Sequence, residues 1–276
     1  MNVTLRWTSL LLSATLLASP GALAQREGVE VGKNSGFARL VPASEVEAGA
    51  AQQYGDMLRD AAGKKALAPA NHPQVMRLRR IAQRIIPYSY DWNPRARDWK
   101  WEVNLIGSKQ INAFCMPGGK IIFYTGILEQ LQLTDDEVAQ VMGHEIAHAL
   151  REHARERIGK NAATQGMARL GGAVVAGIFG LDPRLTDSVA RGGANLLTLK
   201  FGREDESEAD LVGLELAARA GFDPQAGITL WQKMAANGGG APPEWLSTHP
   251  AGNTRIADIE RNLPRVMPLY EKAKKR

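Results

Sequence analysis

Cysteine is almost absent from this sequence: Cys115 is the only one among 276 residues. The chain therefore cannot form an internal disulfide, and its stability must come from core packing and from any metal that it binds. Aromatic residues make up only 6% of the chain, but 44% of the residues are hydrophobic. This composition is typical of a globular protein, and the length suits one principal domain with a sizeable core.

Long hydrophobic runs are absent as well. Two apolar stretches, at residues 10–18 and 170–181, are both too short to cross a bilayer comfortably as a helix. The first stretch follows Arg6 and precedes the small-x-small sequence Ala22-Leu23-Ala24, which predicts a signal peptide over residues 1–24 with cleavage before Gln25. A retained anchor is the alternative for this segment. The second stretch either packs against the protein or makes peripheral contact with a membrane.

Neither sign of charge dominates the chain. The formal net charge is +5, and removal of the signal peptide takes away only Arg6 and leaves +4. Such a mild charge does not indicate a nucleic-acid partner.

The order of apolar and turn-forming residues predicts an α+β fold that is mostly helical. Residues 25–43, with several glycines and little periodicity, are expected to form an extended N-terminal lead-in, followed by a single domain over 44–276. Three short strands, at 101–106, 111–115 and 120–125, are expected to form a small antiparallel sheet. Helices are expected at 44–62, 73–86, 134–158, 203–220, 224–236 and 252–262, with one more ending near 199.

Capping boxes predict where two of these helices begin. Ser44 precedes Glu47 by three positions, and Thr134 precedes Glu137 by the same spacing. The helix that starts at Thr134 carries the clearest chemical motif of the chain.

His144-Glu145-Ile146-Ala147-His148 places two imidazoles one helical turn apart, so both can face a single ion. Neutral imidazoles suit zinc, which lowers the pKa of a bound water to about 7. Glu145 can reach that water and act as the general base. His153 lies nine residues after His144, about 180° around the same predicted helix, and is expected to face solvent or packing.

A third ligand is expected from the acidic stretch 204–210. Glu206 and Asp210 are four residues apart and share one helix face, so Glu206 can bind metal while Asp210 accepts the free N–H of a ligand histidine. Spacing alone leaves Glu204 and Glu208 open as alternatives, and a solvated acidic face is a further possibility.

Together these motifs resemble those of peptidase family M48, a group of gluzincins that includes the CAAX prenyl endopeptidase and bacterial quality-control proteases. The resemblance extends over roughly residues 71–263 and is closest to the soluble periplasmic branch. It implies a zincin-like fold, one Zn²⁺ per chain, and Glu206 as the third ligand. The matching segments are Asn112-Ala113-Phe114 with Pro117-Gly118-Gly119, His144 to His148, Glu206 to Asp210, and Ser247 to Pro250 followed by Arg255-Ile256.

The resemblance also suggests roles for residues outside the zinc motif. Asn112, Ala113 and Phe114 are candidates for a strand edge that binds an extended peptide, with an ordinary core strand as the alternative. His249 can donate to the oxyanion of the transition state, occupy the open position of zinc in a resting enzyme, or merely cap a nearby backbone. Arg255 can aid the oxyanion or pair with an acidic neighbour.

The predicted function is therefore that of a zinc-dependent endopeptidase that is exported to the periplasm, with peripheral membrane contact through 170–181 as a further expectation. The family resemblance suggests that its polypeptide substrates are damaged or misassembled envelope proteins. The alternative is a zinc-bearing periplasmic chaperone or assembly factor with little proteolysis.

Overall fold

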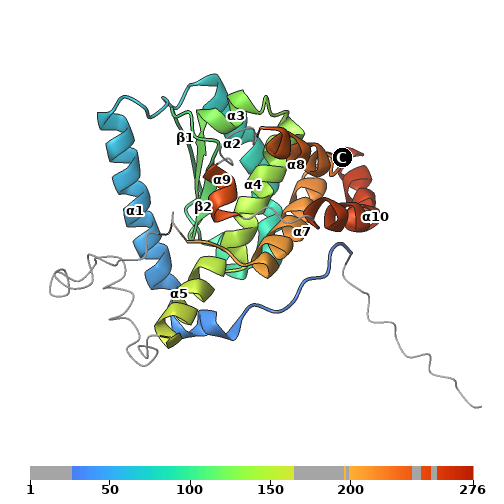
Figure 1. Cartoon of the computed structure of the whole chain (residues 1–276), viewed down its shortest axis with the longest axis horizontal. Coiled ribbons are helices and arrows are strands. Elements are labelled where there is room, and N and C mark those ends of the chain that lie inside the picture. The colour runs from blue at the N-terminus through green and yellow to red at the C-terminus, as the bar shows by residue number, and fades with distance from the viewer. Residues whose placement is uncertain (1–26, 165–195, 197–198, 238–243, 250–253, 276) are drawn as a thin grey trace, which may run out of the picture.

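The structure, a computed structural model, describes residues 27–164, 196, 199–237, 244–249 and 254–275 (Figure 1). The expected signal peptide, the apolar stretch 170–181 and the helix expected to end near 199 therefore lie outside the described residues or almost entirely so. Within the described part of the chain, no helix is both long and apolar enough to span a bilayer.

A three-stranded sheet lies between helices. Its strands are β1 (Glu102–Ile106), β2 (Ala113–Met116) and β3 (Lys120–Tyr124), in the spatial order β1-β3-β2. β2 and β3 form the expected antiparallel hairpin, but β1 runs parallel to β3. The prediction of a wholly antiparallel sheet was therefore wrong. The connection from β1 to β3 spans residues 107–119 and contains β2 itself, which gives the chain enough length for a parallel crossover.

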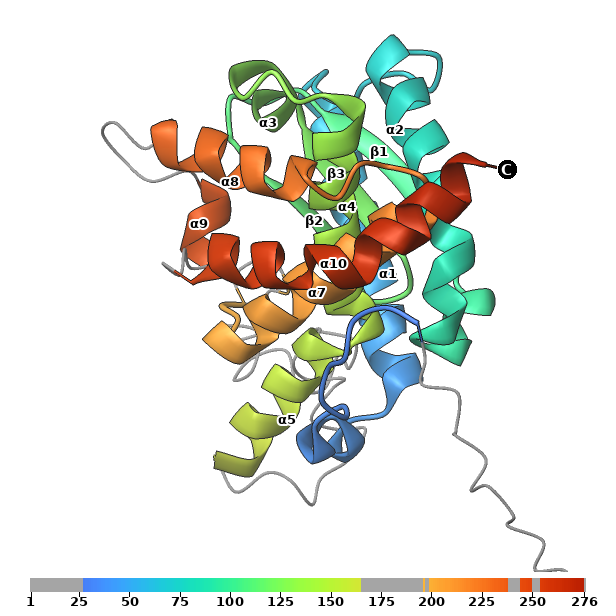
Figure 2. The same ribbon diagram turned by 90° about the vertical axis from the view of Figure 1, so that its right-hand side faces the viewer.

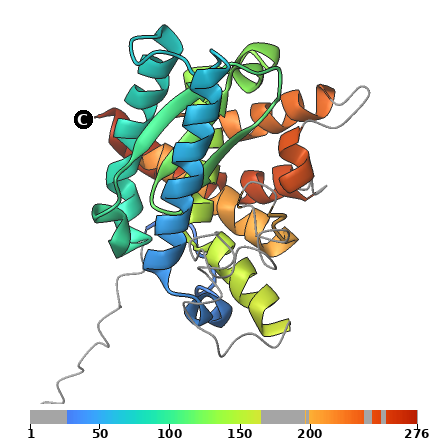
Figure 3. The same ribbon diagram turned by 90° about the vertical axis from the view of Figure 1, so that its left-hand side faces the viewer.

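Helices make up most of the remaining structure, so the expected α+β fold class is confirmed. Figures 1 and 3 show α1 on one face of the sheet and α4 on the other. Figure 2 shows α10 running across α7. The helices are α1 (Ala43–Gly63), α2 (Pro73–Ile85), α3 (Thr125–Gln130), α4 (Asp135–Leu150), α5 (His153–Thr164), α7 (Arg203–Arg219), α8 (Ala226–Ala236), α9 (Glu244–Thr248) and α10 (Arg255–Lys274). Three short 3-10 helices lie at Gly36–Leu40, Ile86–Asp91 and Pro94–Arg97.

The two predicted capping boxes differ in outcome. At α4, Thr134 and Glu137 make both reciprocal hydrogen bonds, as expected. At α1, the helix begins one residue early, with Pro42 at the N-cap and no side-chain cap. Glu47 instead accepts hydrogen bonds from Arg95 and Trp99, so tertiary partners outcompete the local cap.

The helix expected over 134–158 is interrupted after Leu150. Glu152 adopts a left-handed conformation with φ 59°, and α5 begins at His153. No glycine, proline or asparagine marks this break in the sequence. The side chain of Arg151 donates to Gly32 O and to Glu208, which shows that contacts from distant segments meet at the interruption.

The last helix is longer than expected. α10 passes through Pro264 and Pro268 and continues to Lys274, beyond the expected end near 262. Val266 and Leu269 are buried against the core, so packing offsets the loss of backbone hydrogen bonds at the two prolines.

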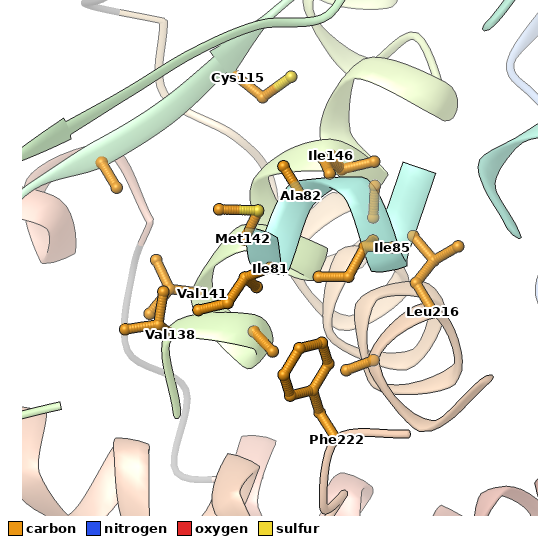
Figure 4. Close-up of a cluster of buried hydrophobic side chains, with 14 of the residues drawn as sticks. Ile81, Ala82, Ile85, Cys115, Val138, Val141, Met142, Ile146, Leu216 and Phe222 are labelled. Atoms are coloured by element: carbon orange, nitrogen blue, oxygen red, sulfur yellow. The ribbon is translucent and has the colours of Figure 1, made fainter. Parts of the chain in front are cut away.

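α4 is central to the core and is buried from Glu137 to Leu150. Figure 4 shows side chains of α2 and α4 gathered with others of the core, including Leu216 of α7 and Phe222. α7 crosses α4 closely because glycines meet there: a Cβ on Gly213 would lie 2.5 Å from His144 N, and one on Gly143 would lie 2.6 Å from Gly213 O. This crossing sets the distance between the two helices that carry the predicted ligands.

Candidate metal centre

The three polar side chains of the HExxH motif lie within the buried part of α4. His144, Glu145 and His148 are only 2–3% exposed. Polar groups at such depth need hydrogen-bond or metal partners, because burial without one is costly. α7 and the residue after α9 supply the partners.

Glu206 and His249 complete a cluster of four side chains whose donor atoms all lie within 4.8 Å of one another. His144 Nε2 lies 3.0 Å from His148 Nε2 and 3.3 Å from His249 Nδ1. Glu206 Oε1 lies 3.0 Å from His249 Nδ1 and 3.5 Å from His148 Nε2. These four residues form a possible zinc site.

The spacing of the donor atoms fits a small tetrahedral ion. Zinc–ligand bonds of about 2.0–2.1 Å place neighbouring ligand atoms about 3.3–3.4 Å apart. His144 Nε2 lies 3.0 Å from His148 Nε2, 3.3 Å from His249 Nδ1 and 3.6 Å from Glu206 Oε2, close to this spacing. Among the described residues, no well-directed hydrogen bond reaches the buried Oε2 of Glu206, although Arg255 Nη1 lies 2.9 Å away. The donor set therefore fits a metal.

The electrostatics of the cluster keep two of its donors, His148 and Glu206, in the forms that bind metal. Burial, followed by the neighbouring histidines, holds the pKa of His148 well below its usual range, which favours the neutral ring. Burial raises the pKa of Glu206, but His249, His144 and Arg255 together lower it below its ordinary value. A neutral imidazole and an ionised carboxylate are both ligands for Zn²⁺.

Asp210 supports the cluster from the side. Its Oδ1 lies 2.9 Å from His144 Nδ1, so the carboxylate meets the ring nitrogen that faces away from the cluster. Arg255 donates to both oxygens of Asp210, at 2.5 and 2.6 Å. Of the two alternatives for Arg255, the structure shows pairing with acidic neighbours. The guanidinium also stacks on Trp231, 3.9 Å from the ring centroid.

Glu145 has a partner that the sequence analysis did not identify. Trp245 Nε1 donates to Glu145 Oε1 at 2.6 Å, and His249 Nε2 lies 3.6 Å from the same oxygen. Trp245 precedes His249 by one turn, and His249 N donates to Trp245 O. A tryptophan four residues before the histidine was the only signal in the sequence.

The two carboxylates left open as alternative ligands lie elsewhere. Glu204 is exposed. Glu208 accepts from Arg151 at 2.8 Å, and its Oε2 lies 2.9 Å from His153 Nε2. Burial opposes ionisation of Glu208, but His153 and Arg151 lower its pKa below the ordinary value.

His153 is in packing, one of its two expected surroundings, but it packs toward the metal cluster rather than away from it. The ring is 2% exposed, and its Nδ1 lies 2.9 Å from Nδ1 of His148. The expectation assumed one continuous helix, whereas the break at Glu152 turns His153 back toward the cluster.

Asn112, Ala113 and Phe114 line a cavity of about 40 Å³ together with Glu145, His148 and His249. β2 is an edge strand of the sheet, as a peptide-binding strand must be. The remaining cavity wall is largely apolar and includes Met116, Ala154, Leu196, Leu199 and Phe201.

Comparisons with known proteins agree with this geometry. The chain is similar to the mitochondrial metalloendopeptidase OMA1 of Schizosaccharomyces pombe, with 35% identity over 214 residues that cover 77% of this chain and 57% of the relative. OMA1 of Homo sapiens is 33% identical over 62% of this chain and 34% of its own length. The beta-barrel assembly-enhancing protease of Escherichia coli O157:H7 is 31% identical over 60% of this chain and 35% of its own length.

The chain thus spans at most about 57% of the length of these relatives. The model of Peptidase family M48 matches residues 73–263, which is more than half of the chain and includes every residue of the cluster. The chain therefore belongs to peptidase family M48.

Proposed function

We propose that this chain is a zinc-dependent endopeptidase that hydrolyses internal peptide bonds of exported or outer-membrane proteins. The observation that carries the proposal is the buried cluster of His144, His148 and Glu206. Glu145 lies beside it and, with His148, lines a cavity next to the edge strand. Neither a structural core nor a plain binding surface requires this combination of groups.

His144, His148 and Glu206 would hold the zinc ion, and Asp210 would fix the orientation of His144 through its Nδ1. When bound, zinc polarises the scissile carbonyl and makes a water molecule acidic. The residue that removes the proton of this water is Glu145, which later delivers it to the leaving amine. Trp245 holds Glu145 Oε1 and leaves the second carboxylate oxygen for this transfer.

The edge of β2 would bind the substrate backbone. Tyr124 N donates to Asn112 O across the hairpin. Because antiparallel pairing alternates along a strand, this register directs the backbone groups of Ala113 and Cys115 away from β3. The N–H of Ala113 donates to Asn112 Oδ1, but its carbonyl and the backbone of Cys115 can pair with an extended peptide, which supports the assignment of Asn112 to Phe114 as substrate-binding residues. The apolar wall of the cavity favours a hydrophobic substrate side chain.

His249 would occupy the open position of zinc in the resting protein. Its Nδ1 lies among the other ligand atoms, at 3.0 Å from Glu206 and 3.3 Å from His144, which supports this role over that of a distant oxyanion donor. Arg255 would act through Asp210 and Glu206, with which it is paired.

A role in envelope quality control is the finer part of the proposal. It is supported by the signal-like residues 1–24 and by the similarity to the beta-barrel assembly-enhancing protease. Periplasmic location and peripheral membrane contact through 170–181 belong to the same proposal. The OMA1 relatives are mitochondrial by name, so the proposed periplasmic location rests on the signal-like residues 1–24.

The substitution Glu145→Gln tests whether the chain acts as a peptidase or as a zinc-bearing chaperone. Glutamine can still accept from Trp245 but cannot take up the proton, so cleavage of unfolded casein should fall by at least about a hundredfold, as expected for loss of a general base. Zinc content and thermal stability should match the wild type. Glu204→Gln, at an exposed position of α7, is the matched control and should leave cleavage unchanged.

A cell-envelope assay distinguishes the two functions. Under the proposal, a folded and zinc-loaded Glu145→Gln variant fails to support envelope integrity. Full activity of this variant would reject the peptidase account and favour the chaperone.

A further inference from the structure

A second line of hydrogen-bonding groups lies behind the metal cluster, at His148, whereas Asp210 contacts His144. His148 Nδ1 lies 2.9 Å from His153 Nδ1, and His153 Nε2 lies 2.9 Å from Glu208 Oε2. We infer that His153 and Glu208 form a relay that fixes the ring orientation and tautomer of His148 as a metal ligand. His153 is thus a positioning residue that acts through His148. The inference rests on the proposed zinc site.

The tautomers of the relay follow from the chemistry of ligation. A neutral His148 that presents the lone pair of Nε2 to an ion must carry its proton on Nδ1. That N–H faces His153 Nδ1, which must therefore accept. His153 then carries its own proton on Nε2 and donates it to Glu208 Oε2. Every group in the line has one consistent role.

Arg151 holds the far end of the relay. It donates to Glu208 Oε1 at 2.8 Å, and His153 faces Oε2, so both oxygens of the carboxylate are bound. Arg151 also donates to Gly32 O at 2.5 Å. His148, His153 and Arg151 are 3%, 2% and 8% exposed, whereas the side chain of Glu208 is 20% exposed. The contact between the two imidazoles is therefore closed to solvent, and only the Glu208 end of the relay reaches the surface.

The backbone conformation that delivers His153 is unfavourable by itself. The left-handed region is sterically unfavourable for a residue that has a Cβ, and Glu152 adopts it with φ 59°. A continuous helix would turn His153 away from His148. The relay gives this conformation a purpose. The break places an acceptor, His153 Nδ1, beside His148, the histidine of α4 that Asp210 does not contact.

Two amide substitutions separate the accepting role of His153 from its donating role. In His153→Asn, the amide oxygen can replace Nδ1 and accept from His148. In His153→Gln, the longer amide can replace Nε2 and donate to Glu208, but no acceptor remains at the Nδ1 position. In His153→Phe both functions are lost while the ring shape is kept.

Zinc affinity of the full chain, measured by competition with a chromophoric chelator, is the readout. We expect His153→Gln and His153→Phe to weaken zinc binding about 10- to 100-fold, as is typical when the group behind a ligand histidine is lost. His153→Asn should bind zinc more tightly than either. His72→Asn is the control, because His72 caps α2 through Gln74 N and asparagine is a good cap.

Urea unfolding of the metal-free proteins shows whether a change in affinity merely reflects lost stability. The relay is rejected if His153→Gln binds zinc as tightly as His153→Asn, or if a folded His153→Phe matches the wild type. If His153→Phe does not fold, the comparison of the two amide variants decides. Failure of the wild-type chain itself to bind zinc would reject the proposed function, whereas equal binding by wild type and variants would reject only the relay.

Discussion

His249 illustrates how much depends on the placement of a single side chain. Burial lowers its pKa, but the nearby carboxylates of Glu145 and Glu206 raise the pKa above the ordinary value. The ring therefore interacts with both the proposed general base, Glu145, and the proposed ligand carboxylate, Glu206. Such a group can close the centre when no substrate is present and must move before a peptide can enter.

The substitution His249→Ala should raise the cleavage of casein severalfold, because the active form no longer competes with a closed one. Zinc affinity should fall, since one donor is lost. Initial rates of casein cleavage at saturating zinc measure the effect, with His72→Asn as the control. Unchanged or lower cleavage would instead assign His249 to support of the transition state.

The crossing of α4 and α7 is the element on which the centre depends. Gly143 immediately precedes His144, and Gly213 follows Asp210 by three residues. The two glycines let the backbones approach so closely that a Cβ on either one would overlap main-chain atoms of the other helix. The ligands of α4 can meet Glu206 only because this contact is so short.

Gly213→Ala should destabilise the protein by about 1–3 kcal/mol, as overpacking of a rigid core does, and should also weaken zinc binding. Gly227→Ala in α8 is the matched control, because the nearest atoms to its Cβ would be 3.5 Å away. Alanine there should be neutral or stabilising by up to about 1 kcal/mol. Urea denaturation measures both variants, and equal stability of the two would contradict the role of the close crossing.

At the scale of the whole molecule, a metal can replace the cross-links that the sequence lacks. The only cysteine, Cys115, is buried and free. The candidate ligands come from α4, from α7 and from the residue after α9, so an ion there connects segments more than 100 residues apart. Metal binding is then part of the free energy of folding.

Removal of zinc by a chelator should abolish cleavage and lower the thermal midpoint. At a free zinc concentration one thousand times Kd, bound zinc contributes about 4 kcal/mol to stability. Calorimetry with and without chelator measures the shift. Glu145→Gln should show the same shift without any cleavage, because Glu145 is not a proposed ligand. Undiminished turnover after thorough chelation would contradict the zinc mechanism.

Patterns set by neighbouring residues were predicted well. The spacing of His144 and His148, the cap at Thr134 and the hairpin from β2 to β3 were all identified from the sequence, because helical periodicity and tight turns act over a few residues. The direction of β1 was not, because strand pairing depends on the path of the connecting chain. α1 lost its predicted cap to partners about 50 residues away.

The sequence by itself determined which helix carries the paired imidazoles and which acidic stretch can reach them. Only the tertiary structure decided how the carboxylates divide, with Glu206 in the cluster and Glu208 behind it. It also decided that the helix breaks at Glu152 and returns His153 to His148. The reason is physical: helix periodicity is a local property, whereas the side to which a buried polar group turns depends on partners that only folding brings near.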